Sequence, residues 1–223
     1  MSYFSVGVIL DANMIDDAVE EILQAYQQEL KELGDNGVVT QDEKNTIKNE
    51  VVKRFTSIQL EPFCEDTEVE PYVEVSIEGT KATYNSNAKW DYFVIGGRWA
   101  PGFKKKGEET KSGVVVETDT DNFKSYARIK DIEFIRSITE EDRNKLRNEY
   151  EKLTTESHSN YFKERCPSYE DYEQYITTFS TDALLTADGK WHESEDAEYA
   201  DSYSALIEKE NPENYFVLVD CHI

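Results

Sequence analysis

The stretch Tyr-Phe-Val-Leu-Val-Asp-Cys-His-Ile at residues 215–223 carries the strongest strand signal in the chain. Its first five residues are all aromatic or aliphatic, which favours a buried β-strand. Residues Ser2–Leu10, at the other end of the sequence, alternate loosely between polar and apolar and predict a second strand. We expect these two terminal strands to pair at the centre of a sheet.

Two helices are predicted directly after the first strand. Apolar residues recur with helical spacing over Ile15–Leu33. Thr40 and Glu43 have the spacing of a capping box, and a second helical pattern covers about Gln41–Ser57. The sequence therefore predicts a helical hairpin inserted at about residues 11–58.

The rest of the chain alternates short strands with further helices. Val73–Ile77 and Tyr92–Ile95 have strand patterns, and helices are expected to open near Thr139 and at Ser168. This order predicts an α+β fold, a mostly antiparallel sheet with helices packed on one face and the N- and C-terminal strands central. No linker or repeat interrupts the pattern, so we expect a single domain over residues 1–223.

Acidic residues dominate the charge of the chain. Among 223 residues there are 24 Lys and Arg against 47 Asp and Glu, a formal net charge of −23. Such a charge disfavours direct nucleic-acid binding, which needs a basic surface. The aromatic fraction of 12% argues against a disordered acidic chain and for a packed core.

The N-terminal sequence and the spacing of the cysteines indicate the cellular compartment of the protein. Residues 1–10 have no basic region and only a short apolar run, so neither a signal peptide nor a membrane contact is expected. The three cysteines, Cys64, Cys166 and Cys221, are odd in number and far apart. This spacing favours neither disulfides nor a cysteine metal cage and indicates a reducing, cytoplasmic setting.

The segment Lys89–Trp99 combines groups that could hold a small ligand. Two glycines allow close backbone approach, an arginine offers several N–H donors, and two tryptophans offer ring faces. The alternative is a purely structural strand end, with a glycine bulge, both tryptophans in the core and Asp91 paired with Arg98. The candidate ligand-binding residues here are Trp90, Asp91, Gly96, Gly97, Arg98 and Trp99.

The C-terminal segment adds two candidates, Asp220 and His222, to this set. Neighbours in a strand point to opposite faces, so Asp220 and His222 can share a face while Cys221 takes the other. His192 could join them in acid–base chemistry. No metal or cofactor is expected, and no catalytic residue can be assigned.

Carboxylates also cluster along the sequence and form a candidate acidic surface. It is either a solvated face that keeps the protein soluble or a surface that docks on a basic protein. The residues are Glu65, Asp66, Glu68, Glu70, Glu193, Glu195, Asp196, Glu198 and Asp201.

Several motifs resemble an uncharacterised family of phage and prophage proteins with a W-D-x-x-x-I-G-G-R-W motif and a V-D-C-H-I C-terminus. Here the motifs are Trp90–Trp99 and Val219–Ile223, supported by Ala127–Ile132 and Asp188–Glu193. The chain departs from that family at Ser194–Tyr203, which is acidic and free of glycine. The helical insertion also looks unusual and could contact a partner.

The resemblance implies an accessory protein of a bacteriophage or mobile element that acts in the bacterial cytoplasm. With the charge, it favours an acidic inhibitor of a host defence or nucleic-acid-binding protein, of the anti-CRISPR or anti-restriction type, whose partner would be a basic nuclease or defence complex. The alternative is a nucleotide-binding protein or hydrolase, which requires the Trp90–Trp99 and Asp220–His222 segments to converge. A third hypothesis makes these motifs the signature of the fold core, with function on variable surfaces.

Overall fold

A computed structural model describes residues 3–34, 36–67, 72–77, 80–99, 125–135, 137–156, 166–193 and 199–223. Contacts divide the chain into two compact units. The first joins Met1–Ile132 to Thr181–Ile223, and the second is Glu133–Ser180. The single domain expected from the sequence stays a prediction.

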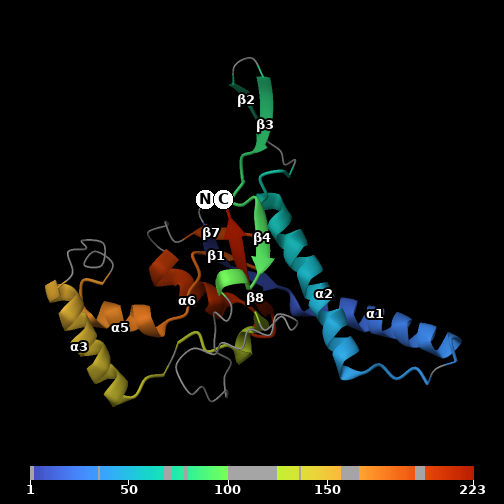
Figure 1. The fold of residues 1–223 in the computed structure, drawn as a ribbon, viewed down its shortest axis with the longest axis horizontal. Helices are drawn as coiled ribbons and strands as arrows, with labels where there is room; N and C mark the ends of the chain where they lie inside the picture. Colours follow the sequence, from blue (N-terminus) through green and yellow to red (C-terminus); the bar gives the residue numbers. More distant parts are fainter. Residues whose placement is uncertain are drawn as a thin grey trace. The chain divides into compact units, whose positions relative to one another are not determined.

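The first unit is built on a six-stranded sheet with the order β4-β8-β1-β6-β7, in which β5 also pairs with β8 (Figure 1). Only the pairing of β1 with β6 is parallel among the strand pairs of this sheet. The α+β fold with a mostly antiparallel sheet is therefore confirmed, and the terminal strands are central as predicted. The strands are β1 (Tyr3–Leu10), β4 (Tyr92–Ile95), β5 (Tyr126–Arg128), β6 (Ala183–Leu185), β7 (Trp191–Glu193) and β8 (Tyr215–His222), and a separate hairpin consists of β2 (Tyr72–Ile77) and β3 (Thr80–Asn85).

One face of the sheet packs on the predicted helical hairpin, formed by α1 (Ala12–Glu32) and α2 (Gln41–Leu60). The Asp11 side chain caps α1, and the capping box of Thr40 with Glu43 opens α2 as the sequence predicted. Alternate residues of β1 and β8 point to this face because strand side chains repeat every two residues. The resulting core includes Val6, Val8, Ile15, Val51, Val52, Leu60, Val217 and Val219.

The opposite face of the sheet is apolar at one end and polar at the other. Ile9, Phe216 and Leu218 are completely or almost completely buried there. Tyr203 in α6 (Tyr199–Lys209) is also buried, and its hydroxyl lies 3.3 Å from the Thr181 hydroxyl just before β6. Toward the C-terminal end of β8, this face carries Ser5, Asp220 and His222, all buried. Short 3₁₀ turns, η1 (Glu61–Phe63), η2 (Gly97–Trp99) and η3 (Ile129–Asp131), connect the elements of this unit.

The second unit contains α3 (Glu140–Glu156) and α5 (Tyr169–Thr177). Ser168 and Asp171 form the capping box of α5, and Tyr172 packs its ring 5.6 Å from that of Tyr150 on α3. None of the described helices is long and apolar enough to cross a membrane.

Candidate functional site

The register of three strands gathers polar and aromatic side chains at one end of the central sheet. His222 on β8 lies opposite Tyr3 on β1 and opposite Tyr92 on β4. In the next row, Asp220 lies between Ser5 and Val94. Directly opposite residues in antiparallel strands share a face. Both rows therefore lie on the face that turns away from the helical hairpin.

His222 is held between two tyrosine rings and a carboxylate. Its ring lies 4.6 Å from the ring of Tyr3 and 4.7 Å, stacked, from that of Tyr92. Its Nδ1 lies 2.8 and 3.0 Å from the two carboxylate oxygens of Asp91. The side chain of His222 is only 8% exposed, and its Nε2 is buried with no hydrogen-bond partner among the described residues.

The Asp91 carboxylate settles which nitrogen of His222 carries the proton. Burial alone would raise the pKa of Asp91, but hydrogen bonds from His222 and from the backbone N–H of Tyr92 lower it below its usual value. An ionised carboxylate only accepts, so Nδ1 must donate. In a neutral ring, Nε2 is then an acceptor that faces no donor.

Asp220 is covered by the glycine turn between β4 and η2. Its Oδ2 accepts hydrogen bonds from the backbone N–H of Arg98 at 3.0 Å and from its Nε at 3.2 Å. Its Oδ1 is buried without a hydrogen-bond partner in the described chain. Gly97 has a φ of +52°, and a Cβ there would lie 2.4 Å from the Cβ of Asp220. The turn can therefore approach Asp220 only because residue 97 is glycine.

Arg98, Tyr3 and Tyr92 form the outer layer of the cluster. The Cζ of Arg98 lies 3.2 Å from the centroid of the Tyr3 ring, a cation–π arrangement. The hydroxyls of Tyr3 and Tyr92 are 2.8 Å apart and exposed. This bond raises the pKa of Tyr92. We refer to Tyr3, Asp91, Tyr92, Arg98, Asp220 and His222 as the sheet-end cluster.

The structure brings together most, but not all, of the residues predicted to bind a ligand. Asp91, Arg98, Asp220 and His222 converge, and the turn of Gly96 and Gly97 lies over Asp220.

Trp90 lies apart from these residues, whereas Trp99 directly follows Arg98 at the end of η2. Trp90 is buried in the core on the other face of the sheet, where its Nε1 donates to the carbonyl of Leu60 at 3.2 Å. Trp99 is 36% exposed. The suggested Asp91–Arg98 pair does not form, because Asp91 bonds to His222 and Arg98 bonds to Asp220.

Sequence reasoning missed Tyr3 and Tyr92. Tyr92 stands inside the quoted motif, and Tyr3 lies in the first strand. Pairing the terminal strands end to end would have placed Tyr3 opposite His222. The placement of His222 between Tyr3 and Tyr92 depends also on the register between β4 and β8, which local sequence does not reveal. His192 lies on β7, and the two strands β1 and β6 separate β7 from β8.

Most of the predicted acidic surface lies outside the described residues. Glu68, Glu70, Glu195, Asp196 and Glu198 are in undescribed segments, as is the side chain of Asp201. Glu65 and Asp66 are exposed, whereas Glu193 forms an ion pair with Lys89.

The cysteines and acidic side chains offer no metal cage in the described part of the chain, where no three His, Cys, Asp or Glu side chains are grouped suitably. None of the three cysteines forms a disulfide with a described residue. Burial raises the pKa of the Cys221 thiol, which points to the core and away from His222. Cys221 is therefore a poor nucleophile.

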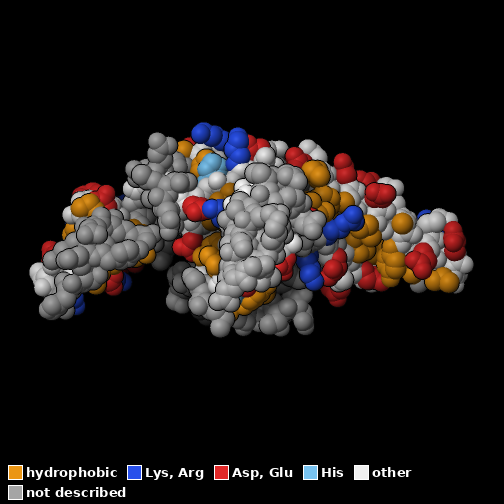
Figure 2. Space-filling view, turned by 90° about the horizontal axis from the view of Figure 1, so that it is seen from above, with side chains coloured by type: hydrophobic (Ala, Val, Ile, Leu, Met, Phe, Trp, Pro, Cys, Tyr) orange, Lys and Arg blue, Asp and Glu red, His pale blue; other side chains and the backbone are white. Residues whose placement is uncertain are grey.

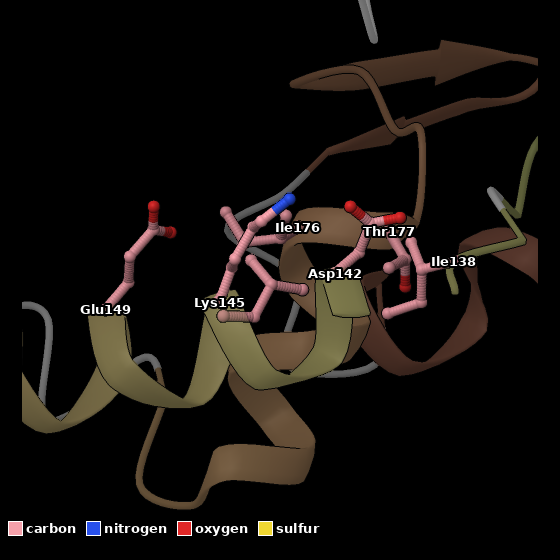
Figure 3. A pocket seen from close by; sticks show the side chains of 7 residues that line it. Ile138, Asp142, Lys145, Glu149, Ile176 and Thr177 are labelled. Atoms are coloured by element: carbon pink, nitrogen blue, oxygen red, sulfur yellow. The ribbon is translucent and has the colours of Figure 1, made fainter. Parts of the chain in front are cut away.

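An open hollow of about 190 Å³ lies in the second unit between α3 and α5 (Figure 3). Its charged residues already have partners. Lys145 pairs with Glu141 at 2.8 Å, Asp142 accepts from the Thr139 hydroxyl, and Glu149 accepts from the Tyr172 hydroxyl. The hollow is therefore a weaker candidate for a ligand site than the sheet-end cluster, because its charged side chains already have partners. Its lining is Ile138, Asp142, Lys145, Leu146, Glu149, Ile176 and Thr177.

Comparisons of the chain with protein-family models, with curated proteins and with solved structures found no match. The resemblance to phage and prophage proteins accordingly stays a prediction that rests on the motifs quoted above.

Proposed function

We propose that this chain binds a small planar molecule that donates hydrogen bonds, of the nucleobase or nucleoside class, at the sheet-end cluster. One observation carries the proposal. His222 Nε2 and Asp220 Oδ1 are buried polar atoms without hydrogen-bond partners among the described residues, and they lie two residues apart on the same face of β8. Native proteins rarely leave such atoms unpaired, because each costs about 1–3 kcal/mol of folding free energy.

The chemistry of the two atoms selects the ligand. Asp220 Oδ1 is an acceptor, and so is His222 Nε2 when the ring is neutral, so the matching group carries N–H or O–H donors. The cluster holds two carboxyl groups against one guanidinium, a balance that disfavours a purely anionic ligand. The exposed ring of Tyr92 offers a planar surface for stacking. A nucleobase combines a planar ring with N–H donors.

The two tyrosines control access to His222. Nε2 is shielded from solvent while both rings flank the imidazole. A ligand therefore reaches Nε2 only when one ring moves and the bond between the two hydroxyls breaks. Because this bond is exposed, opening it costs little free energy.

A titration followed by NMR tests the proposal. The full chain, labelled at His222, is titrated with adenosine, guanosine, cytidine and uridine and with their 5′-monophosphates. We expect at least one nucleoside to shift the His222 ring signals with saturation, and its monophosphate to bind no more tightly. If no member of the panel shifts these signals up to its solubility limit, the proposal is wrong. Binding by monophosphates alone would contradict the preference for neutral ligands.

Asp220→Asn separates ligand binding from a structural role. The amide oxygen must turn toward the donors of Arg98, so the amide NH₂ points where Oδ1 stood and presents a donor instead of an acceptor. We expect the variant to fold and to lose ligand binding. Asp188→Asn is the matched control, because Asp188 bonds Lys190 and Thr186 in a turn outside the cluster. Retained binding in folded Asp220→Asn would contradict the proposed contact.

The acidic inhibitor of a host defence protein remains a second proposal from the sequence. Most of its predicted carboxylates lie outside the described residues, so the geometry defines no docking surface for it there.

A further inference from the structure

Helix α1 carries a ridge of apolar side chains, of which Ala18 is half-buried against the core and the others are exposed. Met14, Ala18, Ile22 and Ala25 follow one another at steps of three or four residues and so lie along one side of the helix. Met14 is 56% exposed and Ile22 is 41% exposed. The neighbouring Ile15, in contrast, is buried in the core. We refer to Met14, Ala18, Ile22 and Ala25 as the α1 ridge.

The surroundings of the α1 ridge are strongly acidic. Helix α1 contains six carboxylates and one lysine, a net charge of −5. Asp17, Glu21 and Glu29 stand three or four residues from members of the ridge, and all three are exposed. None of these three forms an ion pair with a described residue. Figure 2 shows hydrophobic side chains exposed between acidic ones over α1 and α2.

The charge decides between two possible occupants of the ridge. A second copy of the chain would bring another helix of charge −5 against the first, and like charges oppose such a contact. A basic segment with an apolar face instead gains from both the carboxylates and the exposed side chains. The small residues Ala18 and Ala25 alternate with the large Met14 and Ile22, which leaves grooves for the side chains of a second helix.

We infer that the α1 ridge docks a basic amphipathic helix of a partner protein. Apolar side chains of that helix cover Met14 and Ile22, and its lysines or arginines meet Asp17, Glu21 and Glu29. This contact is independent of ligand binding at the sheet-end cluster, because the two sites use different elements and different faces of the sheet.

A defined peptide tests this inference on the full chain. The probe is an 18-residue helix of leucine and lysine with amphipathic spacing. The controls are a scrambled peptide of the same composition and a version with glutamate in place of lysine. We expect NMR shifts centred on residues 14–29 for the first peptide alone, with affinity that falls as salt rises from 50 to 300 mM. Equal binding of the scrambled peptide, or shifts centred elsewhere, would overturn the inference.

Substitutions distinguish the ridge from general charge attraction. Ile22→Ser should weaken peptide binding about tenfold, since it removes a large apolar side chain from the contact. Ile58→Ser is the matched control, because Ile58 is 50% exposed on α2 and outside the ridge. Equal losses in the two variants would contradict the assignment of the ridge. Asp220→Asn should leave peptide binding unchanged, so failure of the ligand proposal and failure of this one are separable.

Discussion

The two ends of β8 carry the same combination of side chains but differ in how completely it is bonded. At the first end, Arg128 lies 4.7 Å from the Tyr215 ring and donates to Asp16 at 2.6 Å. The Tyr215 hydroxyl donates to the other oxygen of Asp16 at 2.8 Å. At the second end, Arg98 lies over Tyr3 and donates to Asp220, but only one oxygen of Asp220 has a donor.

This difference separates a structural role from a binding role. The Asp16 network joins α1 to β5 and β8 with both carboxylate oxygens occupied, so it is complete without a further molecule. In the described part of the chain, two buried polar atoms of the sheet-end cluster have no hydrogen-bond partner, and a buried network that is only partly satisfied costs folding free energy. We expect the first network to matter for stability and the second for ligand binding.

Gly97→Ala should have the largest effect on stability. The new Cβ would lie 2.4 Å from the Cβ and 2.5 Å from Oδ2 of Asp220, at a φ of +52°. We expect the free energy of unfolding to fall by about 3 kcal/mol or more, measured by urea titration. Gly189→Ala is the control, since Gly189 has a φ of +80° but no atom within 4 Å of its added Cβ. Its expected cost is about 1 kcal/mol. Equal costs would show that the turn is not closely packed on Asp220.

The two carboxylates should respond differently to loss of charge. Asp16 accepts one hydrogen bond from Arg128 and one from the Tyr215 hydroxyl, and the amide of Asp16→Asn can accept only one of the two. We expect a loss of about 1–2 kcal/mol in the free energy of unfolding. Asp220→Asn should cost less, because the neutral amide removes a buried carboxylate with an unpaired oxygen. Urea titrations of both variants measure the order. A larger loss for Asp220→Asn would contradict the division into a complete and an incomplete network.

Acid should weaken the Asp16 network in a defined pH range. Burial alone would raise the pKa of Asp16, but hydrogen bonds from Arg128 and Tyr215 lower it below its usual value. A carboxyl group with a lowered pKa in the folded state stabilises the protein fully above its unfolded pKa of about 4, and this stability is lost as the pH falls below that value and through the lower folded-state pKa.

The stability difference between wild type and Asp16→Asn should therefore shrink in that range. Thermal unfolding of both proteins between pH 7 and pH 3 measures it. A difference that stays constant down to pH 3 would mean that the Asp16 bonds do not depend on its charge.

Local signals in the sequence predicted the elements of the fold well. The capping-box spacing at Thr40 and the cap residue Ser168 identified where two helices begin, because a cap depends only on residues a few positions apart. The apolar terminal strands were correctly placed at the centre of the sheet. The face shared by Asp220 and His222 followed from the two-residue period of a strand.

The partners within the candidate site could not be predicted in the same way. The sequence suggested a pair between Asp91 and Arg98 because the two are close in sequence. In the structure, each of them bonds instead to a residue of β8. That outcome depends on the register between β4 and β8, which is set by contacts between segments more than 100 residues apart. The position of Trp90 in the core likewise depends on a distant segment, since its Nε1 donates to the carbonyl of Leu60 at the end of α2.

Tyr3→Phe should have the smallest effect on stability. It should slightly lower the free energy of unfolding but strengthen nucleoside binding. The lost hydroxyl bond to Tyr92 is exposed, so we expect a change below about 1 kcal/mol in the free energy of unfolding. Tyr215→Phe, the matched change at the other end of β8, should cost more because its ring is buried and its bond to Asp16 is part of the complete network. Without the Tyr3 hydroxyl, the rings that cover His222 separate more easily, so a nucleoside that binds wild type should bind Tyr3→Phe more tightly. A calorimetric titration measures this, and weaker binding would mean that the Tyr3 hydroxyl contacts the ligand instead of covering its site.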